Sequence, residues 1–268
     1  MPANLLSTIP WRNTIKWIVI DLNEDEEAND LSAWMQQNLR TALDLQHIYY
    51  FRRRDPVKDP WRGWDCSVAK NCAGLAAEAI CDFTDEPLSN AVIVNVDSDN
   101  IFGPPFIDML MGHSKQMVKG ELKGIFYRHP KVGSTTGRIA CTMATFMKIG
   151  GYWEALLPCG SQDVFFMKCP SAEGKTTRVH SEAIGTAVQN NTDVRKGKRG
   201  FFRTDCAQKV ANCNAEHAEM TWEEMNNVNW DKRKAFIRKA LVFPVNGADQ
   251  AIGIDINESP LTVTGSTS

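Results

Sequence analysis

The stretch AVIVNVDSD, residues 91–99, decides the fold prediction for this chain. Its first six residues form a nearly continuous apolar run, which is typical of a strand that is buried on both faces of a parallel sheet. Two aspartates separated by one residue follow this run, and open α/β sheets bind their ligands at the carboxyl ends of their strands. The sequence therefore predicts a buried strand over 91–96 with a candidate site directly after it.

Strand and helix patterns alternate on the N-terminal side of this stretch. The apolar runs IKWIVIDL (15–22) and HIYYF (47–51) predict two further strands. Between and after them, residues 31–43 and 65–80 have apolar side chains at helical spacing, which predicts two helices. This alternation predicts an α/β fold with a mostly parallel, mixed sheet that helices cover on both faces.

The second half of the chain has a less regular pattern. We expect one domain over residues 1–258 and a disordered tail over 259–268, which is rich in Thr and Ser. Between residue 100 and the tail we expect helices at 104–113, 142–149, 205–216 and 222–240 and strands at 123–127, 138–140, 241–245 and 251–256.

Charge and composition narrow the class of protein. The chain has 30 basic and 32 acidic residues and a formal net charge of −2, so it lacks the positive charge that nucleic-acid binding requires. Neither a signal peptide nor an apolar stretch long enough to span a membrane is visible, so we expect a cytoplasmic protein. The eight cysteines include no CxxC pair and are expected to be reduced thiols.

The aspartates that follow the 91–96 strand form the first candidate site. Alternation along a strand directs Asp97 and Asp99 to the same side, so their oxygens can converge on one cation. Hard oxygen ligands suit Mn²⁺ or Mg²⁺, either of which can neutralise a diphosphate. The alternative, which the spacing leaves open, is a turn at the end of the strand with two solvated acids.

A second candidate site lies where Gly160-Ser161-Gln162-Asp163 leads into an apolar helix. Asp163 then lies in a first helical turn, where backbone N–H groups and the helix dipole stabilise a carboxylate. An ionised carboxylate suits a general base that accepts a proton from a hydroxyl. An ordinary acidic residue at a helix N-terminus explains the same pattern and, for this motif alone, is the simpler interpretation.

Five motifs in a fixed order carry a resemblance to a known family. The chain resembles GT-A glycosyltransferases, above all family 2 enzymes and the C-terminal domain of β-1,4-galactosyltransferases, over about residues 5–230. The ordered set is more specific than any one of its members. The motifs are IVID (18–21), AKN (69–71), VDSD (96–99), FMKIGGY (146–152) and QD (162–163).

The resemblance implies a GT-A-like fold and a role for each matching residue. The nucleotide-sugar donor, which the resemblance implies is a UDP-sugar, would contact Asp21, Asn23, Lys70 and Asp97. Asp97 and Asp99 would hold Mn²⁺ or Mg²⁺. Asp163 would be the catalytic base of an inverting, single-displacement transfer to an acceptor hydroxyl. The residues expected to contact the sugar or the acceptor are Gly150, Gly151, Tyr152, Trp153 and Gln162.

Three features depart from the family pattern. Gln162 stands where the family has Glu, which keeps hydrogen bonding but removes a charge. The later His that serves as a third metal ligand has no clear counterpart, so this ligand is open between His180 and Asn190. The family's first strand has no counterpart either, so we expect an N-terminally truncated domain or a sheet that another segment or subunit completes.

These departures keep two other functions open. One is a catalytically impaired GT-A domain that binds a nucleotide or a glycan. The other is a nucleotidyltransferase with a similar α/β architecture and paired aspartates, for which a Gly-rich basic loop after the first strand would be expected. In the leading hypothesis the acceptor is a glycan, a protein or a small molecule, because a fold does not identify partners.

Overall fold

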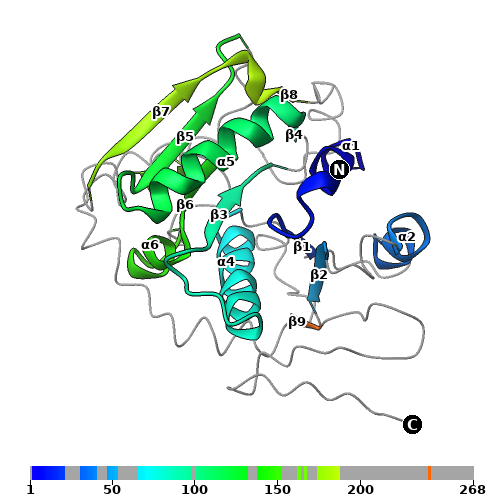
Figure 1. Ribbon diagram of the computed structural model, residues 1–268. Coiled ribbons are helices and arrows are strands. Elements are labelled where there is room, and N and C mark those ends of the chain that lie inside the picture. The colour runs from blue at the N-terminus through cyan, green and yellow to red at the C-terminus, as the bar shows by residue number, and fades with distance from the viewer. Residues whose placement is uncertain are drawn as a thin grey trace, which may run out of the picture.

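The structure is a computed structural model with a mixed α/β architecture (Figure 1). It describes residues 2–21, 31–40, 47–53, 66–97, 100–131, 138–152, 162–163, 166–167, 174–187 and 241–242. The predicted helices at 205–216 and 222–240, the predicted strand at 251–256 and the tail after 258 lie outside these residues.

The first part of the fold is a parallel strand pair. β1 (Trp17–Asp21) and β2 (Ile48–Arg53) pair from Trp17↔Ile48 to Asp21↔Arg52, as the two apolar runs predict. β9 (Leu241–Val242) adds an antiparallel strand on the other edge of β2. The helices of this part are α1 (Pro2–Thr8), the 3₁₀ helix η1 (Ile9–Trp11) and α2 (Leu31–Asn38).

The second part is a four-stranded sheet in the order β3-β6-β5-β7. Its strands are β3 (Val92–Asn95), β5 (Gly124–Arg128), β6 (Arg138–Thr142) and β7 (Thr176–His180). β6 is antiparallel to both of its neighbours, whereas β5 and β7 are parallel. The sheet is thus mixed, and it is less parallel than the βα alternation of the first half predicts.

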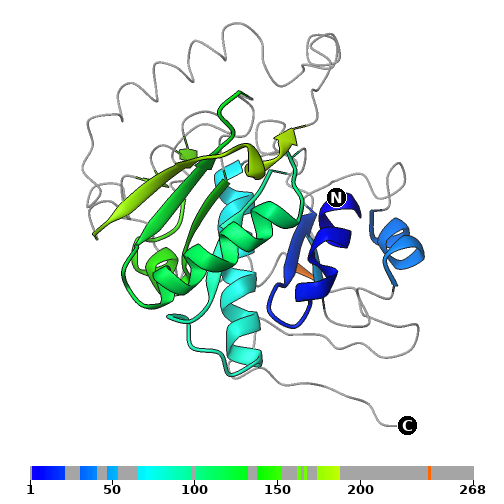
Figure 2. The same cartoon turned by 45° about the horizontal axis from the view of Figure 1, so that its top comes forward.

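Helices cover both faces of this sheet (Figures 1 and 2). α4 (Cys66–Phe83) and α6 (Met143–Lys148) pack on one face, where Ile93 and Ile139 contribute to the apolar core. α5 (Pro104–Val118) packs on the other face, over Ile125 and Tyr127. The alternation of side chains along each strand gives both faces an apolar core, which explains the continuous apolar runs in the sequence.

A small strand pair continues the chain beyond the end of β3. β4 (Asn100–Ile101) pairs antiparallel with β8 (Thr186–Ala187), and the 3₁₀ helix η3 (Glu182–Ile184) precedes β8. Gly185, between η3 and β8, has a φ of 80°, and a Cβ at this position would lie 2.1 Å from the backbone oxygen of Ile101. This close approach requires glycine. In the part of the chain that the structure describes, no helix combines the length and the apolarity needed to cross a membrane.

Candidate functional site

Three of the predicted site residues come together in the structure. The Nζ atom of Lys70 lies 2.6 Å from Oδ1 of Asp163 and 3.9 Å from Oδ1 of Asp97. The Lys70 side chain is 11% exposed, whereas those of Asp163 and Asp97 are 26% and 38% exposed. These residues, far apart in the sequence, form one charged cluster that solvent reaches from the side of the two carboxylates.

Each member of this cluster comes from a different element. Lys70 lies near the beginning of α4, and Asp97 follows β3 directly. Asp163 is in helical backbone next to Gln162, which is buried. The apolar faces of α4 and β3 pack into a common core, and this packing brings the beginning of the helix to the end of the strand.

Tyr152 forms the floor of the cluster. Its ring is fully buried, is stacked on Phe166 at a centroid distance of 4.2 Å, and has Lys70 Nζ at 4.9 Å from its centre. The side-chain amide of Asn95 donates to its hydroxyl at 3.0 Å. The structure therefore does not support the expected contact of Tyr152 with the sugar or the acceptor, because the ring offers no exposed face.

Asn71 fixes the backbone of Tyr152 to α4. Its Nδ2 donates to the Tyr152 carbonyl at 2.7 Å, and its Oδ1 accepts from the Tyr152 N–H at 2.7 Å. A buried amide that satisfies both backbone groups of one residue holds the chain in a defined position. The AKN motif and the 91–96 apolar run contain Asn71 and Asn95, but neither pattern predicts a supporting role for these two side chains. Their buried polar side chains within apolar elements were the available signal.

The two glycines before Tyr152 end helix α6. Gly150 and Gly151 have φ values of 78° and 68°, in the left-handed region that favours glycine. The N–H of Gly150 bonds to the Met147 oxygen and that of Gly151 to the Phe146 oxygen, which is the Schellman arrangement of a helix C-terminus. At the other end of α6, Thr142 caps the helix through the N–H of Thr145. The glycines therefore have a structural reason that is independent of a bound sugar.

A buried arginine holds the segment that follows Asp97. The N–H of Asn100, the first residue of β4, donates to the Asp97 carbonyl at 3.0 Å. Arg138 Nε donates to Oδ1 of Asn100 at 2.6 Å, and its guanidinium also donates to the backbone oxygens of Ile184 and Thr186. Asn4 Nδ2 donates to the Asn100 carbonyl at 2.6 Å. This network fixes the position of Asn100, whose N–H is bonded to Asp97.

The structure does not bring His180 to Asp97. His180 ends β7 and pairs with Arg128 of β5, and β6 lies between β5 and β3. Three strand spacings correspond to about 14 Å, whereas ligands of one cation each lie within about 2.6 Å of it. His180 is therefore corrected as a shared ligand with Asp97. Within the described ranges, no three His, Cys, Asp or Glu side chains are grouped as a metal site.

Several predicted site residues fall outside the description. Asp99, Asn23, Trp153 and Asn190 belong to the residues that the structure does not describe, and of Asp21 it describes the backbone, at the end of β1. The site that can be assessed thus consists of Lys70, Asp97, Asp163 and the groups that support them.

Two buried thiols near the same core are not candidates for nucleophilic chemistry. Burial raises the pKa of Cys141 to about 12, and burial together with nearby acidic side chains raises that of Cys81 to about 11. A thiol with such a pKa is protonated at neutral pH and is not a nucleophile. Both are free cysteines, in agreement with the expected reduced state.

The available comparisons add no relative to this description. No protein-family model, no curated protein and no solved structure matches the chain. The resemblance to GT-A glycosyltransferases stays a prediction from the sequence motifs.

Proposed function

We propose that this protein is a metal-dependent inverting glycosyltransferase that moves a sugar from a nucleotide-sugar, a UDP-sugar, to an acceptor hydroxyl. The observation that carries the proposal is the contact of Lys70 with both Asp97 and Asp163. The sequence motifs assign these three residues to one site, although 93 positions separate the first from the last. A chance resemblance gives no reason for them to meet.

In this proposal Asp163 accepts the proton of the acceptor hydroxyl as that oxygen attacks the anomeric carbon. A carboxylate has about four lone-pair sites, so the hydrogen bond from Lys70 leaves acceptor positions free. Lys70 holds the carboxylate in place and provides positive charge beside the departing nucleoside diphosphate. Tyr152, Asn71 and Asn95 fix the floor under these groups.

The acidic side of the cluster fits a hard divalent cation. Asp97 is the more exposed of the two carboxylates, and its contact with Lys70 is longer than that of Asp163. Carboxylate oxygens are the ligands that hard divalent cations prefer. Asp97 and Asp99 would hold Mn²⁺ or Mg²⁺, with Asn190 as a candidate third ligand. When bound, the cation supplies charge neutralisation for the diphosphate.

One observation favours a second candidate function. The 2.6 Å contact between Lys70 and Asp163 is a charge-assisted hydrogen bond that occupies Oδ1 of Asp163, so this oxygen is engaged by the protein itself. A catalytically impaired domain that binds a nucleotide or a glycan has the same geometry. The two functions differ in turnover, so a binding experiment and an activity experiment are both required.

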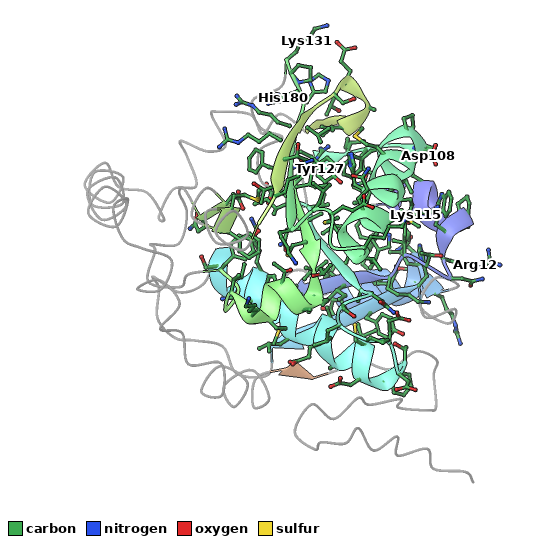
Figure 3. The ribbon with its side chains drawn as sticks, turned by 60° about the vertical axis from the view of Figure 1, so that its left-hand side comes forward. Arg12, Asp108, Lys115, Tyr127, Lys131 and His180 are labelled. Carbon is green, nitrogen blue, oxygen red and sulfur yellow. The ribbon has the colours of Figure 1, made fainter. Side chains whose placement is uncertain are left out.

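The binding experiment measures thermal stability with Mn²⁺ and a panel of nucleoside diphosphates. A ligand at 100 times its Kd stabilises the fold by about 2.7 kcal/mol. We expect a Mn²⁺-dependent shift with UDP that Asp99→Ala abolishes and that Asp108→Asn, an exposed acid on α5, leaves unchanged (Figure 3). Absence of a shift with every nucleotide would remove the basis of the proposal.

The activity experiment uses hydrolysis of the donor, which needs no known acceptor. If UDP binds, release of UDP from a panel of UDP-sugars should fall by about 10²–10⁴-fold in Asp163→Asn, the range for loss of a general base. UDP binding should persist in this variant. Binding without any turnover in the wild type would identify the impaired domain instead.

The edges of the sheets support a further part of the proposal. Among the described strands, β1 pairs only with β2 and β3 pairs only with β6, while α4 packs against both β1 and β3. We propose that a strand from another segment or from a partner subunit completes the sheet at these edges. Light scattering separates the two sources, since only a partner subunit raises the particle mass above that of one chain.

A further inference from the structure

A continuous row of paired residues crosses the four-stranded sheet. Asn95 of β3 pairs with Ile139 of β6, Ile139 pairs with Phe126 of β5, and Phe126 pairs with Arg178 of β7. Directly paired residues lie on the same face of a sheet. Since Asn95 donates to the Tyr152 hydroxyl, this is the face of the Lys70–Asp163 cluster.

Two residues farther along the strands, the same face carries an acidic side chain after β3 and basic side chains at the ends of β5 and β7. β3, β5 and β7 run in the same direction, because β6 is antiparallel to β3 and β5. Two residues beyond the row lie Asp97, Arg128 and His180, at the carboxyl ends of these three strands. Residues two apart on a strand share a face. Arg128, Arg178 and His180 are exposed and adjacent, and we refer to them as the basic face.

The two arginines of the basic face are not neutralised by described residues. Nearby, Glu182 forms an ion pair with Lys131 at 2.5 Å. The carboxylate of Glu182 is therefore already engaged by a lysine. Neither Arg128 nor Arg178 has an ion pair with a residue in the described ranges. Figure 3 shows His180 and Lys131 near the same end of these strands. Arginines in this state suit a carboxylate, sulfate or phosphate group.

We propose that the basic face binds the acidic group of an anionic glycan, which is the acceptor of the reaction. The acceptor role rests on the proposed function, whereas the anion binding rests on the geometry of the sheet. Arg128 lies two strands from β3, about 10 Å across the sheet, and Arg178 and His180 lie three strands from β3, about 14 Å across the sheet. A diphosphate at Asp97 does not span the distance to Arg178 and His180, whereas an extended glycan that runs along the carboxyl ends of these strands does.

The experiment measures the binding of fluorescein-labelled short dextrans by fluorescence anisotropy at low salt. The four probes are dextran sulfate, dextran phosphate, carboxymethyl dextran and uncharged dextran of the same length. The test variant is Arg128→Gln/Arg178→Gln. The matched control is Lys115→Gln/Lys119→Gln, which removes the same charge from two exposed positions on the other face of the sheet. Lys115 lies on α5 (Figure 3), and Lys119 is the residue that directly follows this helix.

We expect at least one anionic dextran to bind more tightly than the uncharged one, and the arginine variant to weaken this binding at least about tenfold. The lysine variant should stay within about twofold of the wild type, because its charges are remote from the bound group. The probe that binds best identifies sulfate, phosphate or carboxylate as the group. Equal weakening in both variants, or no preference for any anionic dextran, would overturn the proposal.

The UDP and Mn²⁺ thermal shift on the same preparations separates this proposal from the proposed function. If the wild type shows the UDP shift but does not prefer anionic dextrans, the anion site on the basic face is rejected and the proposed function is retained. An arginine-dependent preference without any UDP shift retains the anion site and rejects its role in glycosyl transfer.

Discussion

Two buried cations, Lys70 and Arg138, lie toward opposite faces of the same sheet and have different partners. Lys70 contacts the carboxylates of Asp97 and Asp163, which solvent reaches. Arg138 is over the Phe106 ring on the α5 side and donates to the neutral oxygens of Asn100, Ile184 and Thr186. Carboxylates that solvent reaches can exchange a lysine for a ligand, whereas the buried oxygens of Asn100 and Ile184 have no solvent to replace a lost guanidinium donor. The comparison assigns ligand binding to Lys70 and structure to Arg138.

The largest stability effect is expected for Arg138→Met. This change removes the guanidinium donor from the buried oxygens of Asn100 and Ile184 and from the carbonyl of Thr186. Each buried unsatisfied group costs about 1–3 kcal/mol, so we expect the free energy of unfolding to fall by at least about 3 kcal/mol. Urea denaturation of the variant and the wild type measures this difference in the free energy of unfolding. Arg138→Lys should recover only part, because an ammonium cannot serve three acceptors in a fork. A loss below about 1 kcal/mol would break the comparison.

For Lys70→Met the effects on stability and on ligand binding should separate. Because its acidic partners are partly exposed, we expect unfolding to change by only about 1 kcal/mol. The affinity for UDP with Mn²⁺ should fall at least about tenfold, since a charge-assisted contact to the diphosphate is lost. Titration calorimetry measures this affinity, and Lys115→Met on α5 is the control. A pure stability loss with unchanged affinity would make Lys70 structural as well.

Tyr152→Phe tests whether Tyr152 belongs to the ligand site or to the apolar core. The change removes the hydrogen bond from Asn95 to the hydroxyl but keeps the ring on Phe166. We expect a stability loss of about 1 kcal/mol in urea denaturation and an unchanged UDP affinity. If Tyr152 instead contacts the ligand, the affinity will fall more than the stability.

The smallest expected effect on stability is that of His47, a buried histidine that is separate in the sequence from Lys70 and Arg138. Burial lowers the pKa of His47 below its ordinary value of 6.5. The unfolded chain therefore takes up a proton on this residue before the native protein does, and its contribution to stability is lost as pH falls below about 6.5. The slope from one group is at most about 1.4 kcal/mol per pH unit. Denaturation at several pH values should show a smaller slope in His47→Gln, and an identical slope would contradict the assignment.

The sequence predicts the elements better than their pairing. The apolar runs at 15–22, 47–51 and 91–96 locate β1, β2 and β3, and the Ala-rich segment locates α4. Periodicity does not specify which strands pair, and the antiparallel insertion of β6 between β3 and β5 is a tertiary property. β7 was not predicted, because its residues TTRVH are polar and half exposed at the sheet edge.

The candidate site was predicted in part. The motif order names Lys70, Asp97 and Asp163, and the structure brings them together. Tyr152 was misassigned because an aromatic residue after two glycines has the same pattern in a sugar site and in a core. Arg138 was missed as a buried residue, since nothing in the local sequence indicates that a charged residue at the start of a strand has no exposed surface.

The double hydrogen bond between Asn71 and the Tyr152 backbone makes one amide a reporter for the assembly of the site. The Tyr152 N–H is held by a side chain of α4 and not by a neighbouring turn or strand, so its exchange with solvent deuterium requires α4 and the 150–152 segment to separate. The exchange rate of this amide thus reports how often the site opens far enough to separate Lys70 from Asp163. Comparing its rate with that of global unfolding would show whether the site opens by itself or only when the whole fold is lost.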